Sequence, residues 1–366
     1  MLGWIDQTSL SAVSLAGQVQ FVLSLFISGI AAGAGIMAAQ YWGKQDAASI
    51  EKVIPIALRT NLLFSGLFTI LAGFCPEMLM RIFTNDAALV ASGSQYLRAV
   101  ALSYVLCGIS QVYLILLKNT GHAAVSSRIS STAVVLNIIL NAILIYGLCG
   151  APALGIRGAA YATVAARVVE LIWAYLETKK PERVRILWNR LFSSAGKILS
   201  EDFWRYTLPV LAASLVWGIA YVLYSVIMGH MGSDAVAANS ITSIAKSLLS
   251  CLIRGVSGGA GVLIGNLLGA NELEKAREYG GRLSHLSIAI GIVTGGLLML
   301  ISPAIVHFAP LSDTAAEYLQ YMLLFCGLNL MAQSVNTTVL DGIFCAGGDA
   351  KFDMQGNIGA MWCFSV

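Results

Sequence analysis

The chain has 366 residues, of which 57% are hydrophobic and only 11% are charged, and its mean hydropathy is +0.77. A soluble domain carries about 25% charged residues, so this composition excludes a water-soluble enzyme and indicates an integral membrane protein. The formal net charge of +3 also argues against nucleic-acid binding, which needs a concentrated basic face.

Apolar stretches follow one another along the whole chain. A membrane-spanning helix needs about 20 apolar residues, and a window of that length predicts nine complete spans and the start of a tenth near residue 355. The complete spans are 10–40, 53–75, 95–117, 129–149, 154–176, 206–229, 236–268, 283–309 and 316–345. We therefore expect an all-α membrane protein.

The longest polar segment lies between the fifth and sixth predicted spans. Residues 178–205 contain seven basic side chains: Lys179, Lys180, Arg183, Arg185, Arg190, Lys197 and Arg205. Because basic residues concentrate in cytoplasmic loops, we expect this segment to be cytoplasmic.

An internal repeat predicts the architecture. A shift of 226 residues places Gly29, Gly33, Gly35 and Gly43 on Gly255, Gly259, Gly261 and Gly269. The repeat length contains six spans, an even number, so both copies cross the membrane in the same direction. Parallel repeats of this kind form two lobes related by an axis along the membrane normal. The glycines either allow close helix packing or take part in gating.

The same register predicts the domain organisation. It divides the chain into an amino-terminal lobe (1–177) lacking its first helix, a cytoplasmic linker (178–205) and a carboxy-terminal lobe (206–366) lacking its last helix or helices. We therefore expect two six-helix lobes that are incomplete in this sequence, which would be a piece of a twelve-span protein.

Ionisable residues inside predicted spans are candidates for functional sites, because charges in a bilayer are costly. Arg167 and Glu170 lie three residues apart and are expected to form an ion pair on one helix face. Lys246 and Arg254 lie eight apart, also on one face. The latter two either line a substrate cavity, where they would disfavour cationic compounds, or extend to the membrane surface.

An aromatic stripe lies on span 206–229. Trp217, Tyr221 and Tyr224 follow an i, i+4, i+7 spacing and so share a helix face. Their rings either hold flat cationic compounds or serve in packing and interfacial anchoring.

Several short motifs follow one another along the chain: Ala-Ala-Gln-Tyr-Trp-Gly-Lys-Gln-Asp (38–46), its repeat mate Gly-Asn-Leu-Leu-Gly-Ala-Asn-Glu-Leu-Glu-Lys-Ala (265–276), Leu-Lys-Asn-Thr-Gly-His (117–122), Leu-Asn-Ile-Ile-Leu-Asn (136–141), Leu-Gly-Ile-Arg-Gly-Ala-Ala-Tyr-Ala-Thr (154–163) and Leu-Pro (208–209). Together these motifs resemble the multidrug and toxic compound extrusion (MATE) family of cation-coupled efflux antiporters. The resemblance covers essentially the whole chain, with the motifs in the family's order.

The resemblance implies a monomeric transporter in a bacterial cytoplasmic membrane that exports small molecules, with Na⁺ or H⁺ as the coupling ion and no cofactor. It also implies a coupling site at Asn137 and Asn141, which fall on the family's Asn-x-x-x-Asp/Asn pattern. The second position is an amide here, and an amide can coordinate sodium or hydrogen-bond a protonated acid but cannot carry the proton. The alternative is that the two amides only join helices. The family's second, carboxylate-based site is doubtful, since 206–229 contains no acidic residue.

A competing prediction is a flippase for lipid-linked sugars or lipids with a related two-lobe plan. Such a protein needs a basic cavity, which Lys246 and Arg254 would supply. No HExxH motif, paired aspartates or Ser/His arrangement appears in any span, so the sequence favours a transporter over a membrane enzyme.

Overall fold

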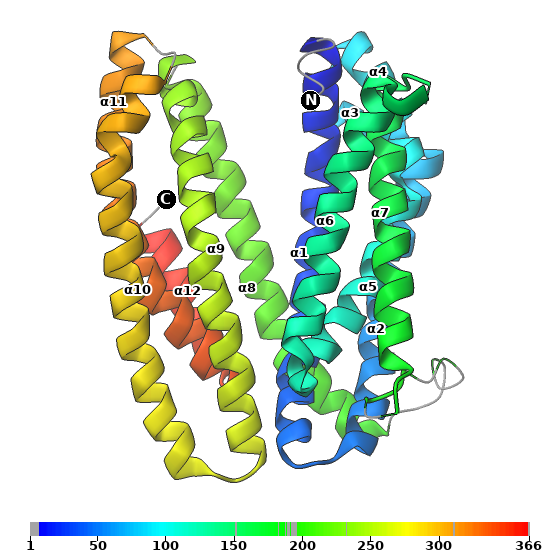
Figure 1. Cartoon of the computed structure of the whole chain (residues 1–366), viewed down its shortest axis with the longest axis vertical. Helices are drawn as coiled ribbons and strands as arrows, with labels where there is room; N and C mark the ends of the chain where they lie inside the picture. The colour runs from blue at the N-terminus through cyan, green and yellow to red at the C-terminus, as the bar shows by residue number, and fades with distance from the viewer. Residues whose placement is uncertain are drawn as a thin grey trace. The chain divides into compact units, whose positions relative to one another are not determined.

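The computed structural model describes residues 7–364 except 151, 182, 187, 189–190, 192–195, 232 and 310–311. The described residues form long helices (Figure 1). Among these residues, eight helical stretches are long and apolar enough to cross a membrane, which confirms the predicted all-α membrane class.

Eight stretches correspond to the nine predicted spans because one stretch contains two of them. Leu102–Tyr146 joins α5 (Leu102–Leu117) and α6 (Ala123–Tyr146) through a π-helical turn, Lys118–His122. The backbone leaves the helical region at Thr120, and Gly121 adopts φ 80°. Ser126 Oγ then donates to the carbonyl oxygen of Leu114 at 3.0 Å, so the chain folds back at this turn.

Unit 1 comprises Met1–Ala38 and Asp46–Ser214. Its helices are most of α1 (Gln7–Gly43), α2 (Ala47–Phe74), α3 (Pro76–Arg81), α4 (Ala87–Val100), α5, α6, α7 (Gly155–Thr178) and the first half of α8 (Lys197–His230). The short 3-10 helix Leu148–Gly150 precedes α7. Its core joins one face of α1, including Val19, Leu23 and Ile27, to Leu97 and Tyr104 from α4 and α5.

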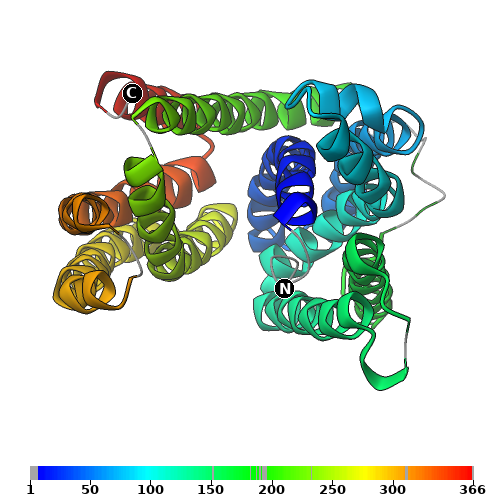
Figure 2. The same ribbon diagram turned by 90° about the horizontal axis from the view of Figure 1, so that it is seen from above.

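Unit 2 comprises Ala39–Gln45 and Leu215–Val366. Its helices are the second half of α8, α9 (Ser233–Gly269), α10 (Leu273–Phe308), α11 (Asp313–Asn336), a π-helical extension of α11 (Thr337–Phe344) and α12 (Ala350–Phe364). Its core packs Ile253 of α9 and Leu298 of α10 against Leu319, Leu323 and Leu330 of α11. Seen from above, α9, α10 and α11 lie side by side and nearly end-on (Figure 2).

The division into units follows packing rather than the predicted polar linker. The boundary after Ser214 lies inside α8, and residues 39–45 at the end of α1 group with unit 2. The boundaries at 177/178 and 205/206 between the lobes and the cytoplasmic linker stay a prediction.

The helix boundaries follow the 226-residue repeat. Helices α1 and α9 end 226 positions apart, at Gly43 and Gly269. Helices α2 and α10 start at Ala47 and Leu273, with the same offset.

Two of the repeated glycines allow close backbone contact. A Cβ on Gly43 would overlap the carbonyl oxygen of Asn266, and a Cβ on Gly269 would overlap the carbonyl oxygen of Gln40. These two contacts are equivalent under the repeat, since Gln40 and Asn266 are also 226 residues apart. By contrast, Gly255 and Gly259 have no described atom within 4 Å of an added Cβ.

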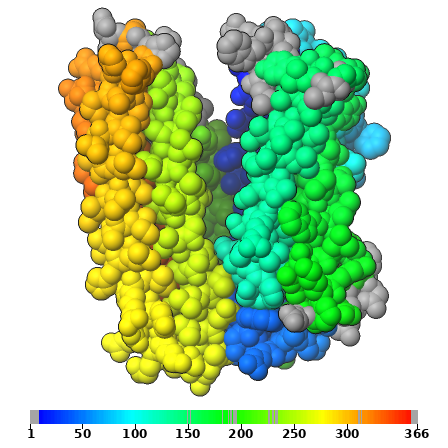
Figure 3. Space-filling model, in the orientation of Figure 1, coloured from blue at the N-terminus to red at the C-terminus, as the bar shows by residue number. Residues whose placement is uncertain are grey.

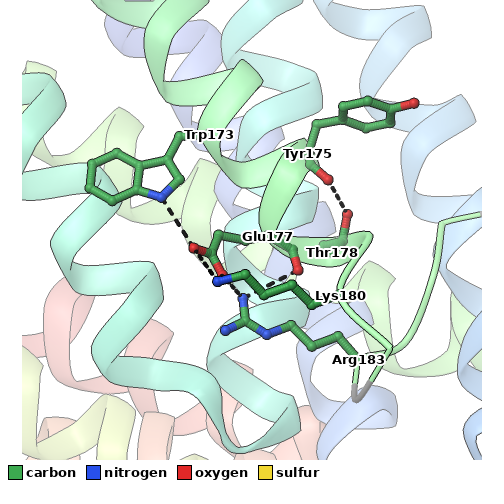
Figure 4. Close-up of polar contacts among 6 residues, drawn as sticks. All are labelled: Trp173, Tyr175, Glu177, Thr178, Lys180 and Arg183. Atoms are coloured by element: carbon green, nitrogen blue, oxygen red, sulfur yellow. Dashed lines mark hydrogen bonds and ion pairs between the residues drawn. The ribbon is translucent and has the colours of Figure 1, made fainter.

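The described part of the segment after α7 is attached to unit 1 by Glu177. This carboxylate accepts hydrogen bonds from Trp173 Nε1 (3.3 Å) and Lys180 Nζ (3.0 Å) and pairs with Arg183 (Figure 4). Further along, Trp188 Nε1 donates to Tyr113 Oη on α5 at 2.8 Å. Part of the basic charge of the predicted cytoplasmic segment is therefore neutralised locally.

Large apolar side chains cover much of the outer surface. On α6, whose side chains lie beside those of α7 in Figure 3, Val134, Val135, Ile138 and Ile139 are each at least half exposed. A surface of this kind suits contact with lipid rather than water.

Candidate functional site

The first candidate site is an amide pair on α6 in unit 1. Asn141 Nδ2 donates to Asn137 Oδ1 at 3.0 Å, as the four-residue spacing predicts. Asn137 Nδ2 donates in turn to Thr163 Oγ1 on α7 at 3.4 Å. Asn141 Oδ1 is buried and has no hydrogen-bond partner among the described residues.

The predicted partners Arg167 and Glu170 lie on α7. Arg167 Nη1 and Glu170 Oε2 are 2.6 Å apart, and the side chain of Glu170 is 2% exposed. Ser110 Oγ, from α5, donates to the other carboxylate oxygen at 3.0 Å. Both oxygens of Glu170 are thus hydrogen-bonded.

Thr163, the partner of Asn137, and the Arg167–Glu170 pair belong to one polar face of α7. Thr163, Arg167 and Glu170 follow an i, i+4, i+7 spacing, so they point to the same side of the helix. A polar row therefore runs from Asn141 on α6, along α7, to Ser110 on α5. Such a row joins three helices by hydrogen bonds in a medium without water.

The second candidate site lies on α8, α9 and α11 in unit 2. The rings of Trp217 and Tyr221 stack, with centroids 5.7 Å apart. Tyr224 Oη donates to Asn239 Oδ1 on α9 at 3.3 Å. Lys246 Nζ, two helical turns beyond Asn239, donates to Asn329 Oδ1 on α11 at 3.4 Å.

Arg254 has different surroundings from Lys246. It is exposed on α9 and lies close enough to Asp341 to interact with its charge. Asn357 Nδ2 donates both to Asp341 Oδ1 (3.0 Å) and to Asp353 Oδ1 (2.9 Å). Arg254 therefore has acidic neighbours, whereas Lys246 has an amide.

Sequence reasoning missed four partners: Thr163, Ser110, Asn239 and Asn329. A signal existed for Thr163, which shares the helical face of Arg167 and Glu170. A signal also existed for Asn239, seven residues before Lys246 on the same helix. Ser110 and Asn329 lie on other helices, and nothing in their spacing indicates which neighbour they meet.

A metal site in a protein gathers several ligand side chains around the ion. No group of three His, Cys, Asp or Glu side chains there could hold a metal ion. Long apolar helices with polar and ionisable groups in their interior are typical of multi-pass membrane transporters.

The chain belongs to the MATE family of membrane transporters, because the family model described as MatE matches residues 1–143 and 209–365. Among curated proteins it is 21% identical over 362 residues to the uncharacterized transporter YisQ of Bacillus subtilis, covering 99% of this chain and 79% of YisQ. It is 25% identical over 327 residues to the probable multidrug resistance protein NorM of Agrobacterium fabrum, covering 88% of this chain and 70% of NorM.

Solved structures agree on the fold. An outward-facing multidrug resistance MATE family transporter of the MOP superfamily superposes with a TM-score of 0.87 at 21% identity, over 98% of this chain and 79% of that one. A MATE protein in the straight conformation gives a TM-score of 0.87 at 21% identity, over 99% and 80%. At this identity the likeness establishes the fold alone, and the family assignment rests on the family model.

Proposed function

We propose that the protein is a cation-coupled antiporter of the cytoplasmic membrane that exports amphipathic small molecules by alternating access. Inward movement of Na⁺ or H⁺ drives the change between states, because the coupling ion binds the two states with different affinity. No chemistry on the substrate is required.

The observation that carries the proposal is the amide pair on α6. An unpartnered buried acceptor costs about 1–3 kcal/mol, and Asn141 Oδ1 is such an acceptor among the described residues. A sodium ion takes oxygen ligands, and a protonated acid donates a hydrogen bond to an amide oxygen. Either would satisfy Asn141 and make the packing of α6 on α7 depend on ion occupancy.

The role of Arg167 and Glu170 in this proposal is structural. Their ion pair and the hydrogen bond from Ser110 fix α7 against α5. An ion bound at Asn141 would then change the hydrogen bonds from Asn141 to Asn137 and from Asn137 to Thr163 on α7, while α5 and α7 stay fixed to each other.

The test is ion-driven transport in proteoliposomes. Asn141→Ala should lower gradient-driven dye transport at least about tenfold, because one ligand of the ion is lost, while thermal stability in detergent stays near the parental value. Asn336→Ala is the matched control, an amide on α11 that is also half-buried, and should transport normally. Parental transport by Asn141→Ala would contradict the coupling role, and loss of folding would assign the pair to helix packing.

A flippase for lipid-linked sugars or lipids is the second candidate, favoured by the basic side chains Lys246 and Arg254 on α9. Flipping of a headgroup-labelled lipid without an ion gradient, together with no export of soluble dyes, would favour the flippase.

A further inference from the structure

Lys246 is a positive charge inside a helix long and apolar enough to span a membrane, and it has no carboxylate partner among the described residues. Its ammonium group has three donors, and its contact in the described residues is one amide oxygen, Asn329 Oδ1, at 3.4 Å. No described carboxylate lies within 4.0 Å of the ammonium group. Arg167, by contrast, is paired with the carboxylate of Glu170. Uncompensated charge in a membrane protein is costly and typically faces a cavity or ligand.

The direction of the side chain argues against simple extension to the membrane surface. Helices α9 and α11 run in parallel, since Ser312 Oγ donates to Asp234 Oδ1 (2.9 Å) near their starts and Ser257 Oγ donates to the carbonyl oxygen of Thr337 (2.9 Å) further along. These two bonds align α9 and α11 nearly residue for residue.

The alignment places Asn329 deeper than Lys246. Lys246 follows Asp234 by 12 residues, whereas Asn329 follows Ser312 by 17, so Asn329 lies about one and a half turns, about 7.5 Å, further along. The ammonium group therefore reaches away from the nearer end of α9. A lysine that extends to the interface does the opposite.

Neutral polar and aromatic side chains lie on the same face of α9 as Lys246 and on α8, which meets that face at Tyr224. Tyr224 bonds to Asn239, which lies on the face of α9 that carries Lys246. Cys326 lies one turn before Asn329 on α11. The stacked rings of Trp217 and Tyr221 continue the same stripe of α8, and they are 37% and 46% exposed.

We propose that Lys246 binds the anionic group of the transported substrate and that Trp217 and Tyr221 contact its apolar or aromatic body. The substrate class is then an amphipathic organic anion, either a soluble one or the headgroup of an anionic lipid. This inference deepens the proposed function, since it names the charge of the compound that the antiporter carries.

Binding tests the inference independently of transport. The purified protein should bind the anion fluorescein, measured by fluorescence anisotropy, and Lys246→Met should weaken binding at least about tenfold, because a desolvated charge pair is lost. Lys246→Arg should retain most of the affinity. Lys351→Met, an exposed lysine near the start of α12, should bind like the parent.

Transport separates this inference from the proposed function. In proteoliposomes the parent should export fluorescein in preference to the cation ethidium, and Lys246→Glu should reverse the preference. Export of ethidium alone, unchanged in Lys246→Met, overturns the inference but leaves antiport intact. Export of neither dye, while fluorescein binding still depends on Lys246, overturns antiport of soluble compounds. In that case, flipping of a headgroup-labelled anionic lipid identifies the lipid as the source of the anion. Fluorescein binding that is absent, or that is unaffected by Lys246→Met, overturns the inference.

Discussion

Gln45 and Asn271, which are equivalent under the 226-residue repeat, adopt the same left-handed backbone conformation, with φ values of 58° and 60°. Each lies in the turn between two long helices, α1 and α2 in one case and α9 and α10 in the other. The repeat has therefore conserved the backbone of the turn with different side chains.

Substitution at these positions should reveal the cost of that conformation. Asparagine tolerates the left-handed region better than glutamine does, and glycine adopts it readily. Gln45→Asn and Gln45→Gly should therefore raise thermal stability. Gln45→Gly should raise it more than Asn271→Gly, because Asn271 already tolerates this conformation. A β-branched residue is an outlier there, and Gln45→Val should cost about 1–2 kcal/mol. Unfolding temperatures in detergent check this order, and a stabilising Gln45→Val would contradict it.

The close approaches at Gly43 and Gly269 predict a strong steric effect. Gly43→Ala or Gly269→Ala would place a methyl group against a backbone carbonyl, which cannot move aside as a side chain can. We expect a loss of about 1–3 kcal/mol. Gly66→Ala is the control, since nothing described lies within 4 Å of its Cβ. Equal stability of all three variants would show that this packing is not needed.

The Arg167–Glu170 pair should behave as a unit. Glu170→Gln leaves a guanidinium without its carboxylate and should destabilise the protein by about 3 kcal/mol. Arg167→Met combined with Glu170→Met removes both charges and should recover much of that loss. Melting temperatures of the two single variants and the double variant measure the coupling. Additive losses would mean that the two side chains act independently.

The orientation in the membrane follows from charge and is testable by labelling. In a background without native cysteines, Ile198→Cys, which replaces a side chain that is 78% exposed, should resist an impermeant thiol reagent in intact cells. Ile82→Cys, at a side chain that is 67% exposed between α3 and α4, should be labelled from outside. The reverse pattern would invert the topology.

Glu177 should protect the segment that follows α7 from proteolysis. Glu177→Gln weakens its contacts with Lys180 and Arg183, and a pair of this kind is worth about 1 kcal/mol. Cleavage by trypsin after Arg183 in inside-out vesicles should therefore be about fivefold faster. Glu201→Gln, whose partner Lys197 is 4.0 Å away and 90% exposed, is the control. An unchanged cleavage rate in Glu177→Gln would show that other contacts hold the segment.

The sequence by itself determined the membrane class, the positions of the spans and the repeat. These follow from local properties, namely the length of apolar runs and the spacing of residues along one helix. The same locality explains why Asn137 with Asn141 and Arg167 with Glu170 could be paired in advance, because residues three or four apart share a helical face.

The tertiary structure decided which helices meet. The bonds from Asn137 to Thr163, from Ser110 to Glu170 and from Lys246 to Asn329 all join different helices. Helical periodicity gives the face of a residue but not the neighbour that packs against it. That neighbour depends on the packing of the whole bundle. The fold-back at residues 118–122 and the division of α8 between two units also depend on the packing of the bundle.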